Sequence, residues 1–364
     1  MSVSLDLSKA FDTLDHGILF QKLEYYGVRG LPLNWLKSYL NNRSQKVSLG
    51  QSGIGSPLLK ISCGVPQGSV LGPVLFLIYI NDIVHSSNSN FFLFADDTTL
   101  LFPFTKQENP SNRISNELNK INLWLQANRL SLNAGKTQSI LFGGTDEIQN
   151  VLDIKINNFK ITLVDYINFL GITFDSKLSW QHHINYIKPK IARNIGIIRR
   201  LRNFLPQNIR KQLYFSLIYP YLTYGVELWG CAAQTYLNPI VALQKRALRV
   251  VAGVAPTAHT GDWFGRLCIM RFDKLYDYHI LLLMFKAFHT QLPGGIQTRF
   301  KTNVNIYNTR QSNLNLVVTR RSTKIQNNRP SVSGPYVWNS LNPIMKELPS
   351  FEIFKSRLKS LSLS

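Results

Sequence analysis

The chain has 364 residues, of which 45% are hydrophobic and 17% charged, a balance typical of a folded protein that excludes global disorder. Its formal net charge is +21: residues 1–180 hold 15 Lys and Arg against 14 Asp and Glu, whereas residues 181–364 hold 26 against 6. Such a cationic second half is typical of a module that binds a polyanion such as nucleic acid. The apolar runs are too short for a membrane span, and the spacing of Cys63, Cys231 and Cys268 predicts neither a zinc site nor a disulfide framework.

The first half of the sequence predicts short strands alternating with amphipathic helices. In chain order, the pattern predicts a strand at Val3–Leu7, helices around Ile18–Tyr26 and Leu33–Leu40, a hairpin over Gln45–Ile61, a Gly- and Pro-rich turn at Gly64–Ser69, a helical run at Leu71–Ile83 and a strand–turn–strand over Phe91–Phe102. It then predicts a helix with an apolar stripe of Ile114, Leu118, Ile121 and Leu125, a strand at Ser139–Phe142, and two more strands within 151–175 with a turn at Asn157-Asn158. This order predicts an α+β fold with an antiparallel sheet and helices packed on one face.

The second half is predicted to be mostly helical and basic. The helical segments are His182–Arg202, Pro206–Tyr219 and Pro239–Val251, and a short helix near Phe351–Leu361 closes the chain. Residues 298–333 are polar, basic and poor in periodicity, which predicts a long loop or a partly ordered segment. The pair His182-His183 is interpreted as a polar helix start rather than a metal site, because adjacent imidazoles point in different directions.

An acidic pair, Asp96-Asp97, lies between two apolar runs and leaves two interpretations open. Adjacent acids at a turn are commonly solvated turn residues. Alternatively, the strands bring both carboxylates into one site, where like charges repel unless a cation such as a divalent metal binds them. Asp6 supplies a third carboxylate, because strand alternation turns it away from its apolar neighbours Leu5 and Leu7. Three carboxylates on one sheet suit two metal ions about 3.5–4 Å apart, the arrangement that phosphoryl transfer uses.

Five segments, in order, resemble the motifs of a reverse transcriptase from a jockey-like non-LTR retrotransposon. They are Ser4–His16 (SLDLSKAFDTLDH), Gly64–Ile83 (GVPQGSVLGPVLFLIYINDI), Phe94–Asp97 (FADD), Leu132–Thr137 (LNAGKT) and Phe169–Trp180 (FLGITFDSKLSW). Each is short, but their order and spacing over residues 4–180 make the resemblance specific. The basic second half resembles the C-terminal region of such elements more faintly.

The resemblance implies a role for each matched residue. Asp6, Asp96 and Asp97 would bind two Mg²⁺ ions, or Mn²⁺, with Asp6 and Asp96 the principal ligands. Lys136 would protonate the departing pyrophosphate, although a solvated loop lysine is an open alternative. The remaining roles concern the nucleotide: Phe11 would exclude a 2′-hydroxyl, Gln67 would contact the nascent base pair, and Pro66 and Gly68 would shape the backbone around it. For Phe11 the alternative is a plain core aromatic, and for Gly68 an ordinary helix-entry turn.

The resemblance also implies an organisation and an activity. Residues 1–180 would form a polymerase palm, 181–297 a helical, basic thumb-like region, and 298–364 a basic irregular tail with a terminal helix. The chain would be an RNA-directed DNA polymerase that uses deoxynucleoside triphosphates to extend a DNA primer on an RNA template. It would not associate with a membrane, and it would be intracellular and located in the nucleus. The alternative is a catalytically silent remnant that binds nucleic acid.

The sequence departs from the family's pattern at its beginning. Met1 stands only five residues ahead of Asp6, so the fingers region that clamps the triphosphate is expected to be missing. Nucleotide affinity would then fall, because positioning contributes much of phosphoryl-transfer catalysis. A partner protein could then supply the fingers region that this sequence is expected to lack.

Overall fold

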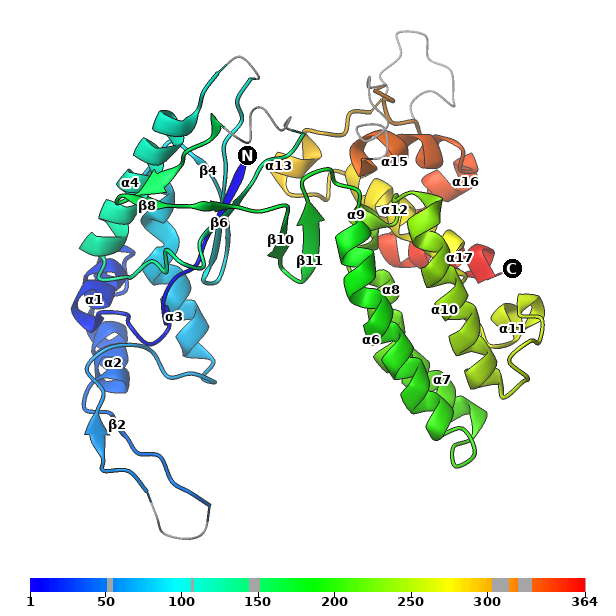
Figure 1. Ribbon diagram of the computed structural model, residues 1–364, viewed down its shortest axis with the longest axis horizontal. Coiled ribbons are helices and arrows are strands. Elements are labelled where there is room, and N and C mark those ends of the chain that lie inside the picture. The colour runs from blue at the N-terminus through cyan, green and yellow to red at the C-terminus, as the bar shows by residue number, and fades with distance from the viewer. Residues whose placement is uncertain (51–54, 106–107, 144–150, 303–313, 320–328, 364) are drawn as a thin grey trace. The chain divides into compact units, whose positions relative to one another are not determined.

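The computed structural model describes residues 1–50, 55–105, 108–143, 151–302, 314–319 and 329–363. The chain divides into two compact units, Met1–Ile167 and Asn168–Ser364, here called unit 1 and unit 2 (Figure 1). The boundary falls within strand β10 (Tyr166–Phe169), which pairs with β11 (Ile172–Asp175). The division at residues 180/181 and 297/298 that the resemblance implies stays a prediction.

A five-stranded sheet forms the centre of unit 1, in the order β4–β5–β1–β6–β9. Its strands are β1 (Ser2–Leu5), β4 (Asn90–Phe94), β5 (Asp97–Leu101), β6 (Gln138–Ile140) and β9 (Thr162–Leu163). Strand β1 is antiparallel to both of its neighbours, and β4 is antiparallel to β5. Strands β6 and β9 are parallel, so the expectation of a purely antiparallel sheet is wrong at this edge, although the α+β class is confirmed.

The path between β6 and β9 explains the parallel pair. Within it, strands β7 (Lys155–Ile156) and β8 (Phe159–Lys160) form a hairpin whose turn residues, Asn157 and Asn158, have φ of +45° and +66°. Asparagine tolerates this left-handed backbone better than most residues, as the sequence pattern predicted. The hairpin packs along α4 (Ser111–Ala127), where Asn119 Oδ1 accepts from the Asn157 amide at 3.0 Å. Because the chain travels along this helix before it returns, β9 enters the sheet in the same direction as β6.

The helices of unit 1 share one core with one face of the sheet (Figure 1). The helices are α1 (His16–Tyr25), α2 (Gly30–Leu40), α3 (Leu71–Ile80), which continues as a 3₁₀ turn over Asn81–His85, and α4; the short strands β2 (Ser44–Gln45) and β3 (Leu59–Lys60) pair beside them. In α4, the predicted stripe of Ile114, Leu118, Ile121 and Leu125 is fully buried. Each such side chain contributes about 1.5–3 kcal/mol when buried.

Strand alternation leaves the opposite face of this sheet more open. Val3 and Leu5 are buried in the core, whereas Ser4 and Asp6 between and beyond them are half-exposed. On β4, Phe92 and Phe94 are 51% and 60% exposed on this second face. Two aromatic rings on an open sheet face beside carboxylates are typical of a surface that meets a ligand rather than of a core.

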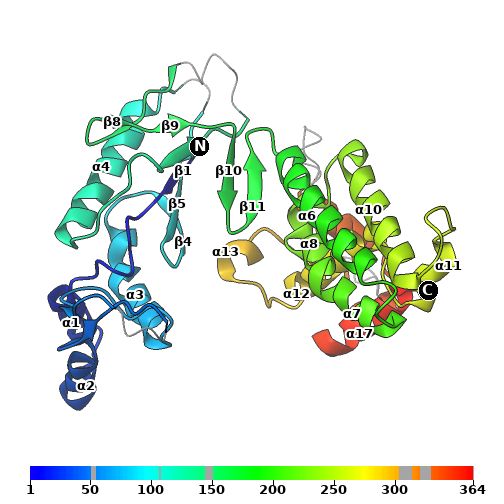
Figure 2. The ribbon, with the colours of Figure 1, turned by 60° about the horizontal axis from the view of Figure 1, so that its bottom comes forward.

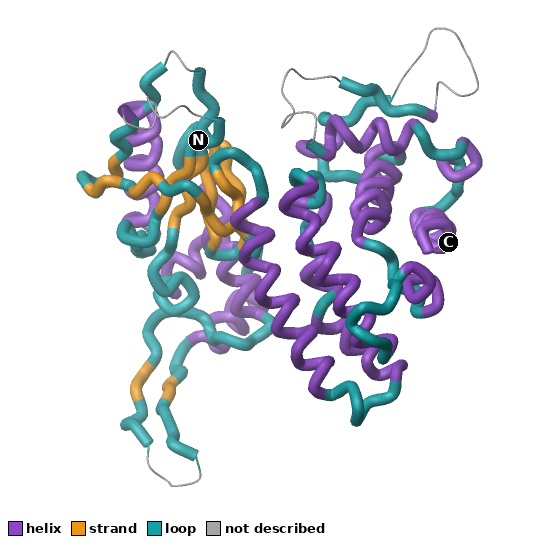
Figure 3. The backbone as a smooth tube through the Cα atoms, turned by 45° about the vertical axis from the view of Figure 1, so that its right-hand side comes forward, coloured by secondary structure: helices purple, strands orange, loops and turns teal. Residues whose placement is uncertain are grey.

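Unit 2 is mostly helical, as the second half of the sequence predicts (Figure 3). Its helices are α6 (Gln181–Arg200), α7 (Gln207–Leu217), α8 (Tyr219–Thr223), α9 (Val226–Trp229), α10 (Gln234–Ala252), α11 (Gly261–Arg266), α12 (Phe272–Phe288), α13 (Gly294–Gln297), α15 (Pro330–Asn339), α16 (Pro343–Lys346) and α17 (Phe351–Leu363). Helix α12 packs against α15 and α17, where Phe285 lies among Trp338 and Phe354. No described helix is long and apolar enough to cross a membrane.

The start of α6 differs from the sequence expectation. His183 is only 2% exposed, its ring lies 5.6 Å from that of Trp229, and its Nδ1 accepts a hydrogen bond from the Thr173 amide. Burial lowers the pKa of this imidazole to about 4, so it is neutral near physiological pH. The interpretation of both histidines as a polar helix start is therefore wrong for His183, which is a core residue of unit 2.

Candidate active site

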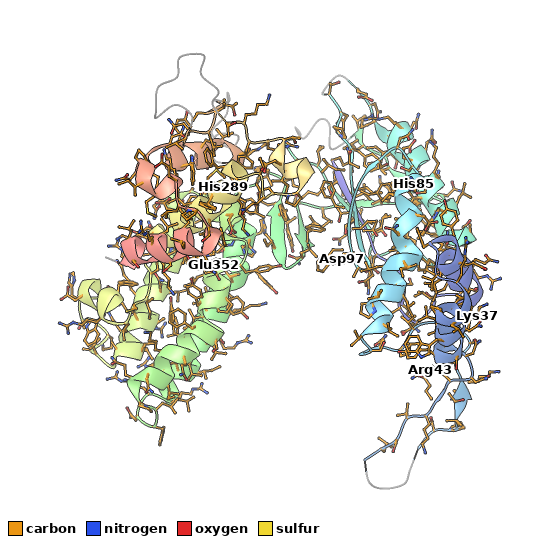
Figure 4. All side chains as sticks on the ribbon, turned by 180° about the vertical axis from the view of Figure 1, so that it is seen from behind. Lys37, Arg43, His85, Asp97, His289 and Glu352 are labelled. Carbon is orange, nitrogen blue, oxygen red and sulfur yellow. The ribbon has the colours of Figure 1, made fainter. Side chains whose placement is uncertain are left out.

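The acidic pair lies at the turn of the hairpin formed by β4 and β5, where Figure 4 labels Asp97. Phe94 pairs directly with Asp97, so Ala95 and Asp96 are the two turn residues. Ala95 has φ of +52°, as the first central residue of a tight hairpin turn requires. The turn fixes Asp96 at its tip and Asp97 at the first position of β5, and both side chains are exposed.

The register between β1 and β5, which are neighbouring strands in Figure 2, places Asp6 beside this turn. Ser4 pairs with Thr99 and Leu5 with Thr98, so one further step along the same antiparallel register puts Asp6 opposite Asp97. Residues opposite one another in antiparallel strands share a face of the sheet. The backbone therefore brings the three predicted aspartates to one end of the open face, and the metal-binding interpretation of Asp96-Asp97 stays a prediction.

The carboxylates of Asp6, Asp96 and Asp97 carry negative charge that no described cation neutralises. Partial burial first, then the charges of Asp96 and Asp6, raise the pKa of Asp97 above its usual range. Among the described residues, none donates a hydrogen bond or forms an ion pair with the carboxylates of the three aspartates. Within those described residues, no group of three His, Cys, Asp or Glu side chains is placed to hold a metal ion.

The loop that carries Lys136 is attached to the backbone of Asp6. The Asn133 amide donates to the Asp6 carbonyl at 2.8 Å, and the Asp6 amide donates to Thr137 Oγ1 at 3.4 Å. Thr137 is 1% exposed, and its hydroxyl donates in turn to the Asn133 carbonyl at 2.9 Å. Lys136 itself is exposed between these two anchors. The structure therefore brings the predicted lysine next to the strand end that bears Asp6.

The residues predicted to handle the nucleotide come together in a second loop pair. Phe11 is half-buried and stacks on Phe76 of α3 with ring centroids 4.6 Å apart, and its carbonyl accepts from the Val65 amide at 2.8 Å. The carbonyl of Pro66 accepts from the Ser69 hydroxyl at 2.7 Å, at the entry to α3. The loop of residues 8–12 is therefore fixed to the segment that precedes α3.

Gln67 and Gly68 lie on the exposed side of that segment. The Gln67 Nε2 donates to Asp12 Oδ1 at 2.8 Å, which holds the amide in one orientation. Gly68 has φ of +79°, and a Cβ at this position would meet no described atom within 4 Å. The glycine is therefore required for its left-handed backbone, and the space beside it is open to a ligand.

Sequence reasoning missed three residues that support the site: Thr137, Asp12 and Gly64. Gly64 has φ of +82°, and a Cβ there would lie 2.6 Å from the carbonyl oxygen of Asp12, so no other residue fits without displacing the loop. Thr137 and Asp12 lie inside two of the segments that resemble reverse transcriptase motifs. Their location in these segments is the one feature of the sequence that could have identified them. Their partners lie far away in the sequence, at Asp6 and Gln67, so no local pattern predicts these contacts.

The amino-acid sequence is similar to one family model and to several known proteins. Residues 1–174 match the family model described as reverse transcriptase (RNA-dependent DNA polymerase). The chain is 30% identical over 270 residues to the RNA-directed DNA polymerase from mobile element jockey of Drosophila melanogaster, covering 71% of this chain and 29% of that protein. It is 27% identical over 267 residues to the probable RNA-directed DNA polymerase from transposon BS of the same organism, covering 69% and 28%.

A solved structure of telomerase from Candida albicans is matched at a TM-score of 0.36 and 14% identity, covering 72% of this chain and 48% of that one. The chain spans less than a third of the length of the two retrotransposon relatives. Its matched segment, residues 1–174, contains both strands of the acidic hairpin, the strand of Asp6 and the loop of Lys136. This segment therefore matches the reverse transcriptase family, and the two relatives named above are RNA-directed DNA polymerases of mobile elements.

Proposed function

We propose that this chain carries the polymerising site of a non-LTR retrotransposon reverse transcriptase, which adds deoxynucleotides to a DNA primer on an RNA template. The observation that carries the proposal is the convergence of Asp6, Asp96 and Asp97 at one end of the sheet, where each lacks a cationic partner among the described residues. Carboxylate oxygens are the ligands that Mg²⁺ and Mn²⁺ prefer, so the donor set fits a divalent ion.

In this proposal Asp6 and Asp96 are the principal ligands, and Asp97 completes the set. Two bound ions would lower the pKa of the attacking primer hydroxyl and stabilise the leaving pyrophosphate. Lys136, on a loop anchored to the Asp6 backbone, donates a proton to that pyrophosphate. Gln67 and the open space at Gly68 position the nascent base pair, while Phe11 lies beneath the sugar and excludes a 2′-hydroxyl.

Primer extension by the full chain tests this function. The protein, an RNA template, a DNA primer and deoxynucleoside triphosphates are combined with Mg²⁺, and extended primer is measured. We expect extension by the wild type and a loss of at least about 100-fold in Asp96→Asn, since one of the two principal ligands is removed. Asp165→Asn, an exposed acid of unit 1 outside the cluster, serves as the matched control and is expected to retain activity.

A second function, nucleic-acid binding without catalysis, is favoured by the charge distribution. The excess of cations lies almost entirely in residues 181–364, which hold 26 Lys and Arg against 6 Asp and Glu. If Asp96→Asn and the wild type extend primers equally poorly while both bind nucleic acid with a strong dependence on salt, this second function replaces the first. Either function places the protein where it reaches nucleic acid, and we propose the nucleus.

A further inference from the structure

Unit 2 contains a cavity of about 680 Å³ that the polymerising site does not use. It lies among β11 and the loop that follows it, α9 and the α9–α10 connection, α10, α12, α13 with the residues after it, and the first turn of α15. Every lining residue belongs to unit 2, whereas the three carboxylates belong to unit 1. The volume falls in the range of about 300–1,000 Å³ that is common for small-ligand pockets.

Four aromatic side chains are among the residues that line this cavity. Phe174, Trp180, Tyr236 and Phe300 come from four separate places in the chain and line the same space. Phe174 and Trp180 meet edge to face, with centroids 5.3 Å apart, which fixes both rings. Tyr236 is half-buried near the start of α10. Rigid aromatic rings around an open space suit a flat ligand that stacks.

The rim of the cavity is cationic. Lys177, Arg299 and Arg329 line it and are all exposed, and within the described part of unit 2 no acidic side chain pairs with any of them. The lining residues include one acid, Glu227, and its carboxylate already lies 3.3 Å from His279 Nδ1. Three cations without an acidic partner among the described residues, placed around apolar walls, favour a ligand with a flat apolar body and an adjoining anion.

We propose that this cavity takes an unpaired nucleobase of a single-stranded nucleic acid, with the adjoining phosphates on the cations of its rim. In this proposal the base stacks on the aromatic side chains, and Ser179 and Ser331 add two hydroxyl-bearing residues to the lining. Stacking accepts any base, because every base has a π face, so the subsite holds a strand without reading its sequence. The inference rests on the proposed function only in requiring a nucleic-acid partner, and it adds a binding site outside the polymerising centre.

The test separates the base from the phosphates. Fluorescence anisotropy measures binding of the full chain to an oligo(dT) strand and to an abasic strand of equal length and charge, at one salt concentration. We expect the wild type to bind oligo(dT) roughly tenfold more tightly than the abasic strand, as base–aromatic stacking implies. Ala233→Trp, which fills the cavity from its exposed wall, and Tyr236→Ala should both bring this ratio close to one.

Arg200→Ala is the matched control, because it removes an exposed charge of α6 that does not line the cavity. It should weaken both strands equally and leave their ratio unchanged. Thermal melting confirms that each variant is folded. Free thymidine monophosphate at the same base concentration should compete poorly, because it offers a single phosphate to the rim. A strong competitor effect would identify a mononucleotide site instead and overturn the proposal.

Photocrosslinking locates the base directly. An oligo(dT) strand with one 5-iododeoxyuridine should crosslink to Trp180 or Tyr236, as read by mass spectrometry of the digested protein. A wild-type ratio near one, a ratio that Ala233→Trp does not change, or crosslinks confined to residues outside the cavity would each overturn the proposal. None of these readouts needs catalysis, so a failure of primer extension leaves this test intact.

Discussion

Thr137→Val removes one hydroxyl from beneath the candidate active site and nearly nothing else. The hydroxyl donates to the Asn133 carbonyl at 2.9 Å and accepts, at a longer 3.4 Å, from the Asp6 amide. Thr137 is 1% exposed, so valine, which has almost the same shape, leaves the Asp6 amide buried against an apolar methyl group. One lost hydrogen bond costs about 0.5–1.5 kcal/mol, and the unsatisfied amide adds to this, so we expect unit 1 to be destabilised by about 1–3 kcal/mol.

The assay must report unit 1 alone, because two compact units need not unfold together. Pulsed hydrogen exchange of peptides that contain β1, across a urea series, gives the midpoint for the central strand of the sheet. Thr162→Val is the matched control, since Thr162 is exposed on the edge strand β9, and its midpoint should stay close to the wild type. A loss of stability in Thr137→Val below about 0.5 kcal/mol, or no greater than in Thr162→Val, would refute the anchoring of the Lys136 loop to Asp6.

Three further changes probe other parts of the structure. Gly64→Ala should destabilise unit 1 by at least about 2 kcal/mol more than Gly143→Ala in urea unfolding. Both glycines have a left-handed φ, but the new Cβ approaches a backbone oxygen, at 2.6 Å, only at residue 64. Equal losses of stability in the two variants would contradict this close approach. Asp12→Ala should raise the KM for the deoxynucleotide roughly 2- to 10-fold in primer extension with little change in kcat, since the Gln67 amide loses its hydrogen-bond acceptor. Asp12→Asn keeps an acceptor and should restore the wild-type KM. An unchanged KM in Asp12→Ala would argue against this positioning of Gln67. His183 has a folded-state pKa of about 4 against an ordinary 6.5, so the unfolded chain binds more protons than the folded chain between these pH values, and the stability of unit 2 should fall by up to about 3 kcal/mol as pH falls through this window. The urea midpoint of His183→Gln should not show this loss. A His183→Gln variant as acid-sensitive as the wild type would refute the buried, neutral state of His183.

The sequence was sufficient for features that depend on local pattern. The period of two in Val3–Leu7 placed Asp6 on the face opposite Leu5, and two apolar runs around Asp96-Asp97 predicted the hairpin. The helical stripe of α4 and the Asn157-Asn158 turn were predicted for the same reason, since each depends on residues close in sequence.

Features set by distant contacts were not predictable in this way. The parallel pairing of β6 with β9 depends on where the intervening hairpin packs, and the burial of His183 depends on Trp229 from a different helix. The contact of Asp12 with Gln67 joins two loops that are 55 residues apart. The motif resemblance named Gln67 but gave no reason to examine its partner, because pairing across such a distance leaves no periodic signal in one sequence.

Binding of Mn²⁺ to the full chain tests most directly the claim that Asp6, Asp96 and Asp97 form a cation site. Electron paramagnetic resonance counts free Mn²⁺ during a titration in the presence of primer, RNA template and a deoxynucleoside triphosphate. We expect two tightly bound ions for the wild type and for Asp165→Asn, and affinity at least about tenfold weaker for Asp96→Asn, because one of the two principal carboxylate ligands is removed. Equal Mn²⁺ affinity in the wild type and Asp96→Asn would contradict it.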